Sequence, residues 1–494
     1  MSLHTTEYSP AEYSFAELLI DGQWRNGQSN LLRVYNPYNQ KLLTEIALAS
    51  VIDVDTAFLA ASKAQPDWAR MLPSERAEVM RSAVRIMELR HAEIVNWLIE
   101  ETGSVRLKAE FEWSAVRSML LEAASLPTQI SGRILSGDIP DKEHRIYRKP
   151  IGVVTVISPW NWPMHLGVRA IAPALALGNS VVLKPALETP ITGGLLLAKI
   201  FQEAGLPDGV LNIVIGTNEE IGDAVVQHTA SRVLSFTGSS TVGRRINLLA
   251  NNGSVLKHVS LELGGNNPLV VLDDADIDTA VNAAVVGRFL HQGQICVSAN
   301  RIIVDASLYE RFTEGFVARV STLKYGNPQD AETIIGPLIG QRHLDRLLGV
   351  IAQAKSDGAR LRTGAEPEGL VLPPHVFDCV SPDMQLGRNE IFGPVAPLIL
   401  ATDEADALRQ ANDTEYGLTS AVFTQDIARG MRFAEALEAG MTHINDMPAV
   451  DLANMPFGGV KNSGSGRFGA EGVIAQFTRE HWVSQQKYPR QYPF

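Results

Sequence analysis

The sequence predicts an α/β protein with two parallel sheets wrapped by crossover helices, followed by a short C-terminal arm. Short apolar runs such as "IGVVTVISP", "SVVLKPA", "VLNIVIG" and "RVLSFTGS" alternate with amphipathic helical patterns between residues 151 and 238. The same alternation resumes in "SLELGGNNPLVVLDDAD" and continues to "AVFTQDIARGMRFAEAL". A chain of 494 residues is also too long to fold around one hydrophobic core, and its length predicts roughly two to four domains.

Composition narrows the functional class. Hydrophobic residues make up 45% of the chain and charged residues 20%, as in an ordinary soluble protein. The net charge of −12 and the lack of a basic run argue against a nucleic-acid partner. We see no signal-like N-terminus and no run of the ~18 apolar residues that a membrane helix needs, so we expect no membrane partner. Two cysteines offer neither a disulfide framework nor a metal-binding spacing, so we expect a reduced, cytoplasmic protein without a metal.

The elements outside the two sheets follow from local patterns. The segment "ELLIDGQWRNG" predicts a short hairpin that turns at Gly22. Residues 53–124 have helical periodicity, with a serine cap at the start of "SERAEVM" and an end at Gly103. The stretch "RILSGDIPDKEHRIYRKP" is predicted to be an extended polar connection. The tail "REHWVSQQKYPRQYPF" is too short to fold alone and predicts an arm packed on a neighbouring domain or subunit.

Polar or small residues follow the predicted strands of the first sheet at Pro159, Lys184, Gly216 and Gly238. Ligands of parallel sheets bind at the carboxyl ends of strands. Gly238 also precedes Ser239 at a predicted helix start, where backbone amides suit a phosphate, although no G-x-G-x-x-G motif is present. Lys184 either binds a ribose or phosphate there or is solvated.

Three side chains suggest covalent chemistry. Cys296 lies in "HQGQICVSANR", although a lone cysteine is by default a small buried hydrophobe. Glu262, in "SLELGGNNP", is either a general base with a raised pKa or an exposed strand residue. Asn161, in "SPWNWPMH", is either a stiffly held oxyanion donor or a turn residue. His291 is too close in sequence to Cys296 to be good evidence for a catalytic pair, and Cys379 keeps a structural interpretation.

Together these groups form the set needed to oxidise a carbonyl through a thioester: a thiol, a base, an amide donor and a phosphate site. At this point the chain closely resembles the NAD(P)-dependent aldehyde dehydrogenase superfamily. The resemblance rests on "PWNWP", "LKPA", "FTGSSTVG", "LELGGNNP", "GQIC", "EIFGPV" and "PFGGVKNSGSG", in family order over nearly the whole chain. It implies that Cys296 is the nucleophile, that Asn161 and the Cys296 N–H stabilise the oxyanion, and that Glu262 activates the hydrolytic water.

The resemblance also implies how a dinucleotide binds. NAD-preferring relatives often carry a glutamate three positions after the lysine, whereas this chain has Leu187 there and Glu188 next to it. NAD is therefore the expected cofactor, with NADP as the alternative. The expected cofactor contacts are Pro159, Trp160, Lys184, Leu187, Glu188, Gly216, Gly238, Ser239, Leu263, Glu390 and Phe392.

For the aldehyde, the resemblance implies a tunnel with aromatic and aliphatic walls, which suits an aromatic or medium-chain apolar substrate. Arg169 would meet a substrate hydroxyl or carboxylate, or else form a salt bridge in the tunnel wall. The sequence as a whole is similar to those of bacterial benzaldehyde and vanillin dehydrogenases. Glu471 falls where some relatives carry a proton-relaying carboxylate. The expected tunnel residues are Trp162, Leu166, Arg169, Ile295, Val297 and Phe457.

The implied organisation is two Rossmann-like domains and a small β arm, in a homodimer or homotetramer. Residues 1–128 and 149–258 would bind NAD(P), residues 259–460 would form the catalytic domain, and residues 129–148 and 479–494 would form the oligomerisation arm. Three rival functions are weighed: a CoA-acylating aldehyde dehydrogenase, a cysteine-dependent esterase and a non-catalytic protein with the same fold. Glu262 favours hydrolysis over CoA transfer, because CoA-acylating members typically lack it.

Overall fold

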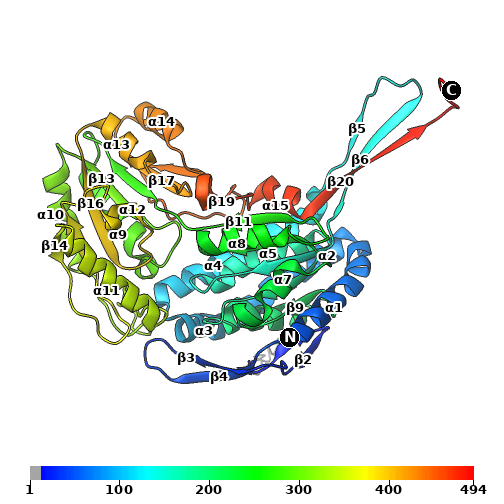
Figure 1. Cartoon of the computed structure of the whole chain (residues 1–494), viewed down its shortest axis with the longest axis horizontal. Coiled ribbons are helices and arrows are strands. Elements are labelled where there is room, and N and C mark those ends of the chain that lie inside the picture. The colour runs from blue at the N-terminus through cyan, green and yellow to red at the C-terminus, as the bar shows by residue number, and fades with distance from the viewer. Residues whose placement is uncertain (1–12) are drawn as a thin grey trace, which may run out of the picture.

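A computed structural model of the chain describes residues 13–494 and contains two mainly parallel sheets, each in its own lobe (Figure 1). The first sheet has the order β19-β11-β10-β7-β8-β9, with only the edge strand β19 antiparallel. All five of its parallel strands end at or near predicted site residues. Its strands are β7 (Val153–Ile157), β8 (Ser180–Lys184), β9 (Leu211–Ile213), β10 (Ser231–Thr237), β11 (His258–Glu262) and β19 (Gly464–Ser465).

The second sheet has the order β14-β15-β16-β13-β12-β17-β18, and only β14 runs antiparallel to its neighbour. The predicted mixed α/β class with parallel sheets is confirmed. Its strands are β12 (Pro268–Val271), β13 (Arg301–Asp305), β14 (Arg360–Thr363), β15 (His375–Asp378), β16 (Val395–Ala401), β17 (Thr419–Phe423) and β18 (Met441–Ile444).

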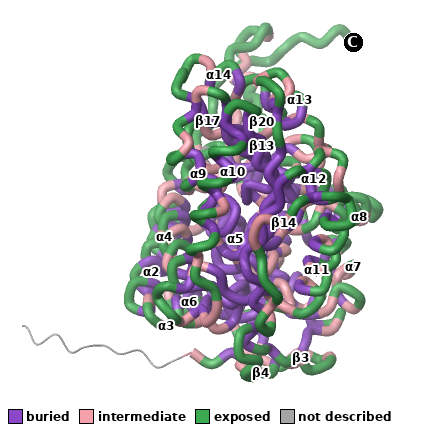
Figure 2. The backbone as a smooth tube through the Cα atoms, turned by 90° about the vertical axis from the view of Figure 1, so that its left-hand side faces the viewer, coloured by how far each residue is buried: buried purple, intermediate pink, exposed green. Residues whose placement is uncertain are grey.

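Helices of the first lobe cover its sheet, and α5 lies deepest among them (Figure 2). Every residue of α5 is buried, because its sequence "PMHLGVRAIAPALA" is apolar almost all round and has no face suited to water. The helices of this lobe are α1 (Val51–Arg70), α2 (Pro73–Leu89), α3 (His91–Thr102), α4 (Arg106–Gln129), α5 (Pro163–Ala176), α6 (Leu196–Glu203), α7 (Asp223–Gln227), α8 (Ser240–Ala250) and α15 (Ala470–Phe477).

The second lobe carries amphipathic helices on its sheet, each with its buried residues on one face. The N-cap side chains of Asp276, Asp403 and Asp426 accept backbone N–H groups at three of these helix starts, as expected of aspartate. The helices are α9 (Ile277–Phe289), α10 (Tyr309–Val320), α11 (Gln341–Ser356), α12 (Gln385–Arg388), α13 (Glu404–Asn412) and α14 (Ile427–Ala436).

Three small antiparallel sheets complete the fold. The predicted N-terminal hairpin is confirmed as β1 (Leu18–Ile20) and β2 (Gln23–Arg25), whose turn residues have positive φ. A second hairpin joins β3 (Leu31–Tyr35) to β4 (Leu42–Ala47). An arm projects from the first lobe and consists of β5 (Arg133–Leu135), β6 (Lys142–Pro150) and β20 (Thr478–Gln486) (Figure 1).

Several local expectations need correction. Residues 133–150 form a hairpin paired with the tail and are more ordered than a polar connection. The helix predicted to begin with a serine cap starts at Pro73, with Leu72 at the cap position, because proline is favoured in the first turn. It also ends at Leu89, and Gly103 terminates the next helix in the left-handed conformation. Cys379 is exposed and does not pack as a buried hydrophobe.

Strand pairing shows where the first sheet ends and the second begins. β11 pairs with β10 along its whole length, so the first sheet extends to Glu262 and the second begins at β12. β19 returns to the same sheet after the second lobe and pairs with β11. Within residues 13–494, no helix has both the length and the apolar character to cross a membrane.

Asn179 joins three elements of the first lobe and should be essential for its stability. Its side-chain oxygen accepts hydrogen bonds from Ile151 and Gly152, and its nitrogen donates to the carbonyls of Ala174 and Phe477. Because Asn179 is fully buried, Asn179→Ala leaves the Ile151 and Gly152 N–H groups and the Phe477 carbonyl without these partners, at a cost of roughly 2–3 kcal/mol. We expect a thermal unfolding midpoint several degrees lower than that of the exposed control Asn252→Ala. Equal midpoints would contradict this role.

Candidate active site

Two cavities meet at Cys296 in the described structure. The first has a volume of about 360 Å³ and the second about 270 Å³. Asn161, Leu166 and Cys296 line both cavities, so they form the wall between them. Two ligands can therefore reach the Cys296 sulfur from different sides.

The loop that carries Cys296 is tightly held. His291, Gln292 and Gly293 have positive φ angles of 50°, 56° and 70°, which turn the chain sharply after α9. The Asn267 side chain then donates hydrogen bonds to the carbonyl oxygen of Cys296, at 2.7 Å, and to that of Ser298. These bonds fix the direction of the backbone on both sides of the thiol.

A glycine opposite this loop makes the close packing possible. A methyl group on Gly265 would lie 2.6 Å from the Cys296 carbonyl oxygen, closer than a carbon atom can approach. Asn267 and Gly265 both belong to the "LELGGNNP" segment, in which the two glycines were expected to end the strand and let another group approach the backbone. No pattern in the sequence showed that this segment faces the cysteine loop.

Glu262 ends β11 and lines the second cavity together with Cys296. It is 3% exposed, and neither carboxylate oxygen has a hydrogen-bond partner among the described residues. Burial raises the pKa of Glu262 to about 8, opposed by Arg169 and Arg467. Burial also raises the pKa of the Cys296 thiol to about 12, again opposed by Arg169. Both groups are therefore mostly neutral near pH 7.

Asn161 follows β7 and is buried beside the cysteine loop. Its side-chain nitrogen donates a 2.8 Å hydrogen bond to the Gln294 carbonyl, two residues before Cys296. An amide nitrogen carries two hydrogens, so one remains available in the cavity wall. The side chain is thus oriented by the loop that carries the nucleophile.

The second cavity has the groups that a dinucleotide requires. At one side, Ser239 caps the N-terminus of α8, where free backbone amides favour a phosphate. At the other, Glu390 accepts a hydrogen bond from the Gly265 N–H, and burial raises the pKa of its carboxyl to about 7. The ring of Phe392 lies edge-on to Trp160, with 5.5 Å between ring centroids. Further lining residues are Pro159, Thr237, Gly238, Leu263, Gly264, His343 and Arg346.

The remaining predicted cofactor residues lie along the same sheet edge, outside the lining of this cavity. Lys184 ends β8, is 4% exposed, and has a pKa lowered by burial to about 8. Two carboxylates, Glu188 and Glu219, oppose that shift, so both are near the ammonium group. Leu187 packs against the core of the first lobe. Gly216 follows β9, where a side chain would collide with Ile221.

Glu219 was not predicted from the sequence. It lies in "GTNEEIG", which was considered only as a failed glycine motif. Its relevance arises because β8 and β9 are parallel neighbours, so the residues after both strands meet at one edge. The buried Lys184, the N-terminus of α8 and the half-buried carboxylate of Glu390 together fit an NAD-type dinucleotide.

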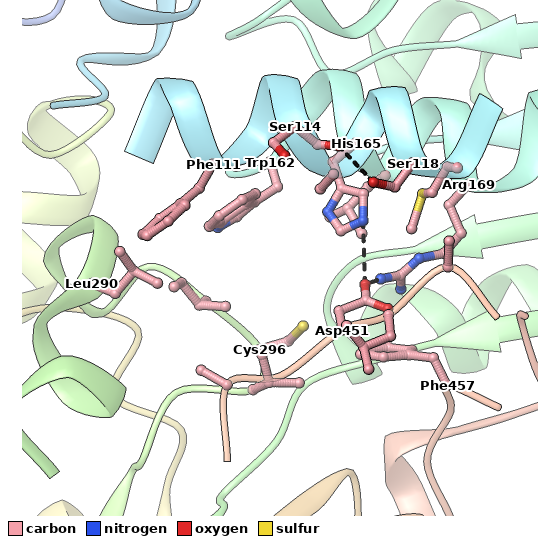
Figure 3. Close-up of a pocket in the computed structure, with 18 of the residues that line it drawn as sticks. Phe111, Ser114, Ser118, Trp162, His165, Arg169, Leu290, Cys296, Asp451 and Phe457 are labelled. Carbon is pink, nitrogen blue, oxygen red and sulfur yellow. Dashed lines mark hydrogen bonds and ion pairs between the residues drawn. The ribbon is translucent and has the colours of Figure 1, made fainter. Parts of the chain in front are cut away.

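The first cavity is lined mainly by aromatic and aliphatic side chains (Figure 3). All six residues expected to contact substrate line it. Helix α4 and residues 447–453 supply most of the lining that sequence reasoning missed. These further residues are Phe111, Ser114, Ala115, Ser118, Met119, His165, Leu290, Met447, Ala449, Asp451, Leu452 and Ala453.

Polar groups gather at one end of the first cavity. Arg169 forms an ion pair with Asp451, which is the wall salt bridge considered as one alternative from the sequence (Figure 3). Glu471, by contrast, is exposed at the start of α15 and lines neither cavity. Its expected relay position is therefore wrong. Within residues 13–494, no cluster of three or more His, Cys, Asp or Glu side chains could hold a metal ion.

Comparison with known proteins agrees with this geometry. A family profile described as "Aldehyde dehydrogenase family" matches residues 24–483. A vanillin dehydrogenase of Corynebacterium glutamicum is 47% identical over 466 residues, covering 94% of this chain and 96% of the relative. The chain belongs to the aldehyde dehydrogenase family.

Two solved structures have the same architecture. A NAD-dependent benzaldehyde dehydrogenase from Corynebacterium glutamicum has a TM-score of 0.90 and 44% identity, covering 98% of this chain and 100% of that one. A salicylaldehyde dehydrogenase from Pseudomonas putida, complexed with salicylaldehyde, has a TM-score of 0.94 and 38% identity, with 97% and 99% covered. The expected family and the Rossmann-like two-domain fold are confirmed.

Asn267→Ala should impair catalysis by loosening the cysteine loop. The change removes both hydrogen bonds to that loop and leaves two buried carbonyl groups without these partners. We expect kcat/KM for an aldehyde to fall by about tenfold or more, since displacement of a catalytic group is costly. Steady-state kinetics measure this loss, with the exposed Asn252→Ala as control. Wild-type kcat/KM in Asn267→Ala would rule the role out.

Glu262 should impose a pH dependence on turnover. A carboxyl with a pKa of about 8 carries its base form only above that pH, so activity that needs the base rises as pH increases through about 8. The pH profile of kcat/KM, which reports groups of the free protein, should therefore show an ascending limb near pH 8. In Glu262→Gln this limb should vanish along with most activity. An unchanged limb in the variant would assign it to another group.

Proposed function

We propose that this protein oxidises aromatic aldehydes to carboxylic acids with NAD, through a thioester on Cys296. The observation that carries the proposal is the position of the thiol. It lies where a cavity with aromatic walls meets a second cavity that fits a nicotinamide. Relatives named benzaldehyde, vanillin and salicylaldehyde dehydrogenases support the substrate class.

In the first step the Cys296 sulfur bonds to the aldehyde carbon. The carbonyl π electrons move to oxygen, and the oxyanion is stabilised by the free amide hydrogen of Asn161 and by the Cys296 backbone N–H. The thiol proton must leave, since the thiolate is the nucleophile. Glu262 in its carboxylate form is the base that faces the same cavity and accepts this proton.

Bound NAD supplies the acceptor for the hydride that leaves the aldehyde carbon, which converts the adduct to a thioester. The chain holds that dinucleotide at three places. The first turn of α8 and Ser239 would hold its phosphates, Lys184 would hold one ribose, and Glu390 would hold the other. Trp160 and Phe392 limit the space beside that ribose.

Glu262 then releases the thiol proton to solvent. In the last step the Glu262 carboxylate takes a proton from water, and the water oxygen bonds to the acyl carbon. The C–S bond then breaks, and the carboxylic acid leaves while the sulfur regains its proton. Burial of Glu262 without a hydrogen-bond partner supports this role, because an unsolvated carboxylate is a stronger base. The same feature favours water over CoA as the acyl acceptor and gives no support to a nucleotide-independent esterase.

Preference for NAD over NADP is supported by charge near Lys184. Leu187 provides no carboxylate, but Glu188 and Glu219 both act on the buried ammonium group. These two charges repel a 2′-phosphate and can accept hydrogen bonds from ribose hydroxyls. The relative described as a NAD-dependent benzaldehyde dehydrogenase agrees with this preference.

We also propose that the protein acts in the cytoplasm as a homodimer or homotetramer. Residues 1–128 and 149–258 bind the dinucleotide, residues 259–460 hold the nucleophile, and residues 129–148 and 479–494 join subunits. Apolar side chains exposed on the arm support the last assignment, because water contact with them is unfavourable. They include Ile134, Leu135, Trp482 and Val483.

The proposed chemistry is tested by separating the oxidation of the aldehyde from the hydrolysis of the thioester. In Glu262→Gln, solvent takes the thiol proton slowly in place of Glu262, while no base activates water for hydrolysis, so one equivalent of NADH per subunit should form slowly with benzaldehyde and then stop. Intact-protein mass spectrometry should show the benzoyl adduct on Cys296. Cys296→Ala should give neither NADH nor adduct. Sustained turnover by Cys296→Ala would contradict the role of Cys296 as nucleophile. Faster reduction of NADP than of NAD by the wild type would contradict the proposed cofactor preference.

A further inference from the structure

Three polar side chains interrupt the apolar lining of the first cavity at one end. Arg169 is ion-paired with Asp451, and the His165 Nε2 atom lies 3.3 Å from the same carboxylate oxygen of Asp451. Arg169 and His165 are 5% and 6% exposed. Figure 3 shows this group beside Cys296, with Phe111, Trp162 and Leu290 at the other end.

Arg169 has donors to spare in this cluster. Its Nη2 contacts Asp451, but its Nε and Nη1 atoms are buried without a hydrogen-bond partner in residues 13–494. One face of the guanidinium lies 3.9 Å from the centroid of the Phe457 ring. Buried donors of this kind are costly unless something supplies an acceptor. A ligand in the cavity is the natural source.

The charges of the cluster cancel. Burial and the neighbouring Arg169 lower the pKa of His165 to about 3, so its ring is neutral. The positive charge of Arg169 is balanced by Asp451. Behind them, Lys108 and Glu112 form a second balanced pair. The cluster therefore offers donors and an acceptor without a net charge.

We propose that Asp451 and Arg169 form a binding site for a ring hydroxyl, so that phenolic aldehydes are preferred over unsubstituted and carboxyl-bearing ones. This inference rests on the proposed oxidation of aromatic aldehydes. A hydroxyl group can donate to Asp451 while it accepts from Arg169, which satisfies both partners at once. A ring carboxylate would meet the Asp451 charge, and a bare ring would leave the Arg169 donors unpaired.

The position of the cluster suits one aromatic ring. Arg169 is near enough to Cys296 to counteract part of the rise in the pKa of the thiol. An aldehyde carbon at the sulfur and a hydroxyl at Arg169 can therefore belong to the same small substrate. Ser114 and Ser118, one helical turn apart on α4, line the same cavity and add hydroxyl groups.

The test compares substrates before it compares variants. The values of kcat/KM with NAD are measured for benzaldehyde, its three monohydroxy isomers and its 3- and 4-carboxy derivatives, at a pH below the pKa of each phenol. In the wild type, the best hydroxy isomer should exceed benzaldehyde by about tenfold or more, and both carboxy derivatives should fall below it. A wild type that prefers benzaldehyde to every hydroxy isomer would overturn the inference without any variant.

Asp451→Asn then removes the charge at nearly constant volume. The ratio of kcat/KM for the best hydroxy isomer to that for a carboxy derivative should drop by about tenfold or more, since Arg169 becomes an unpaired cation. Asp446→Asn, an exposed aspartate in the same segment, should leave that ratio at the wild-type value. An unchanged ratio in Asp451→Asn would also overturn the inference.

The two proposals fail differently. If the wild type oxidises aliphatic aldehydes but not benzaldehyde or any of its derivatives, the proposed substrate class is wrong. If it oxidises benzaldehyde well, but the ratio of kcat/KM for the best hydroxy isomer to that for a carboxy derivative is the same in Asp451→Asn and the wild type, only the hydroxyl site is wrong.

Discussion

The buried carboxylate of Glu112 is the contact on which the geometry of the active site depends. It accepts hydrogen bonds from the backbone N–H groups of Met164 and His165, in the first turn of α5, and pairs with Lys108 one turn earlier on α4. A carboxylate is favourable at a helix N-terminus, where amides lack partners. Through this contact α4 and α5 are held together, and both helices line the first cavity. Asn161 lies just before the same helix start.

Burial determines the protonation states of the catalytic groups. Burial raises the pKa values of both Cys296 and Glu262, so the free protein holds a thiol and a carboxyl near neutrality, although the proposed reaction needs a thiolate and a carboxylate. A neutral thiol reacts slowly with oxidants, which protects the nucleophile between turnovers. Arg169 opposes both shifts, and its pairing with Asp451 limits how strongly it can do so.

Local patterns in the sequence predicted much of the fold, because strands, crossover helices and the first hairpin depend on periodicity and turn residues. Residues at strand ends, such as Lys184 and Glu262, could be singled out because parallel sheets bind ligands there. Asp451 could not, since its partner Arg169 is distant in sequence and no motif links them. Strand order also escaped prediction: β11 looked like the start of the second sheet, although its pairing with β10 places it in the first. A proton-relay role was expected for Glu471 from its position in the family pattern, but such a position does not determine whether the side chain is buried.

Arg169 connects substrate recognition with the reactivity of the thiol. Its guanidinium group interacts electrostatically with Cys296 and Glu262. The same group contacts Asp451 at the polar end of the first cavity. A group that binds between Arg169 and Asp451 changes how the guanidinium charge is shared, and with it the field at the sulfur. In a buried site of low effective dielectric constant, such fields are strong because little screens them. Binding of the ring and activation of the nucleophile are therefore coupled through one cation, and a substituent far from the reacting carbon can influence the first chemical step.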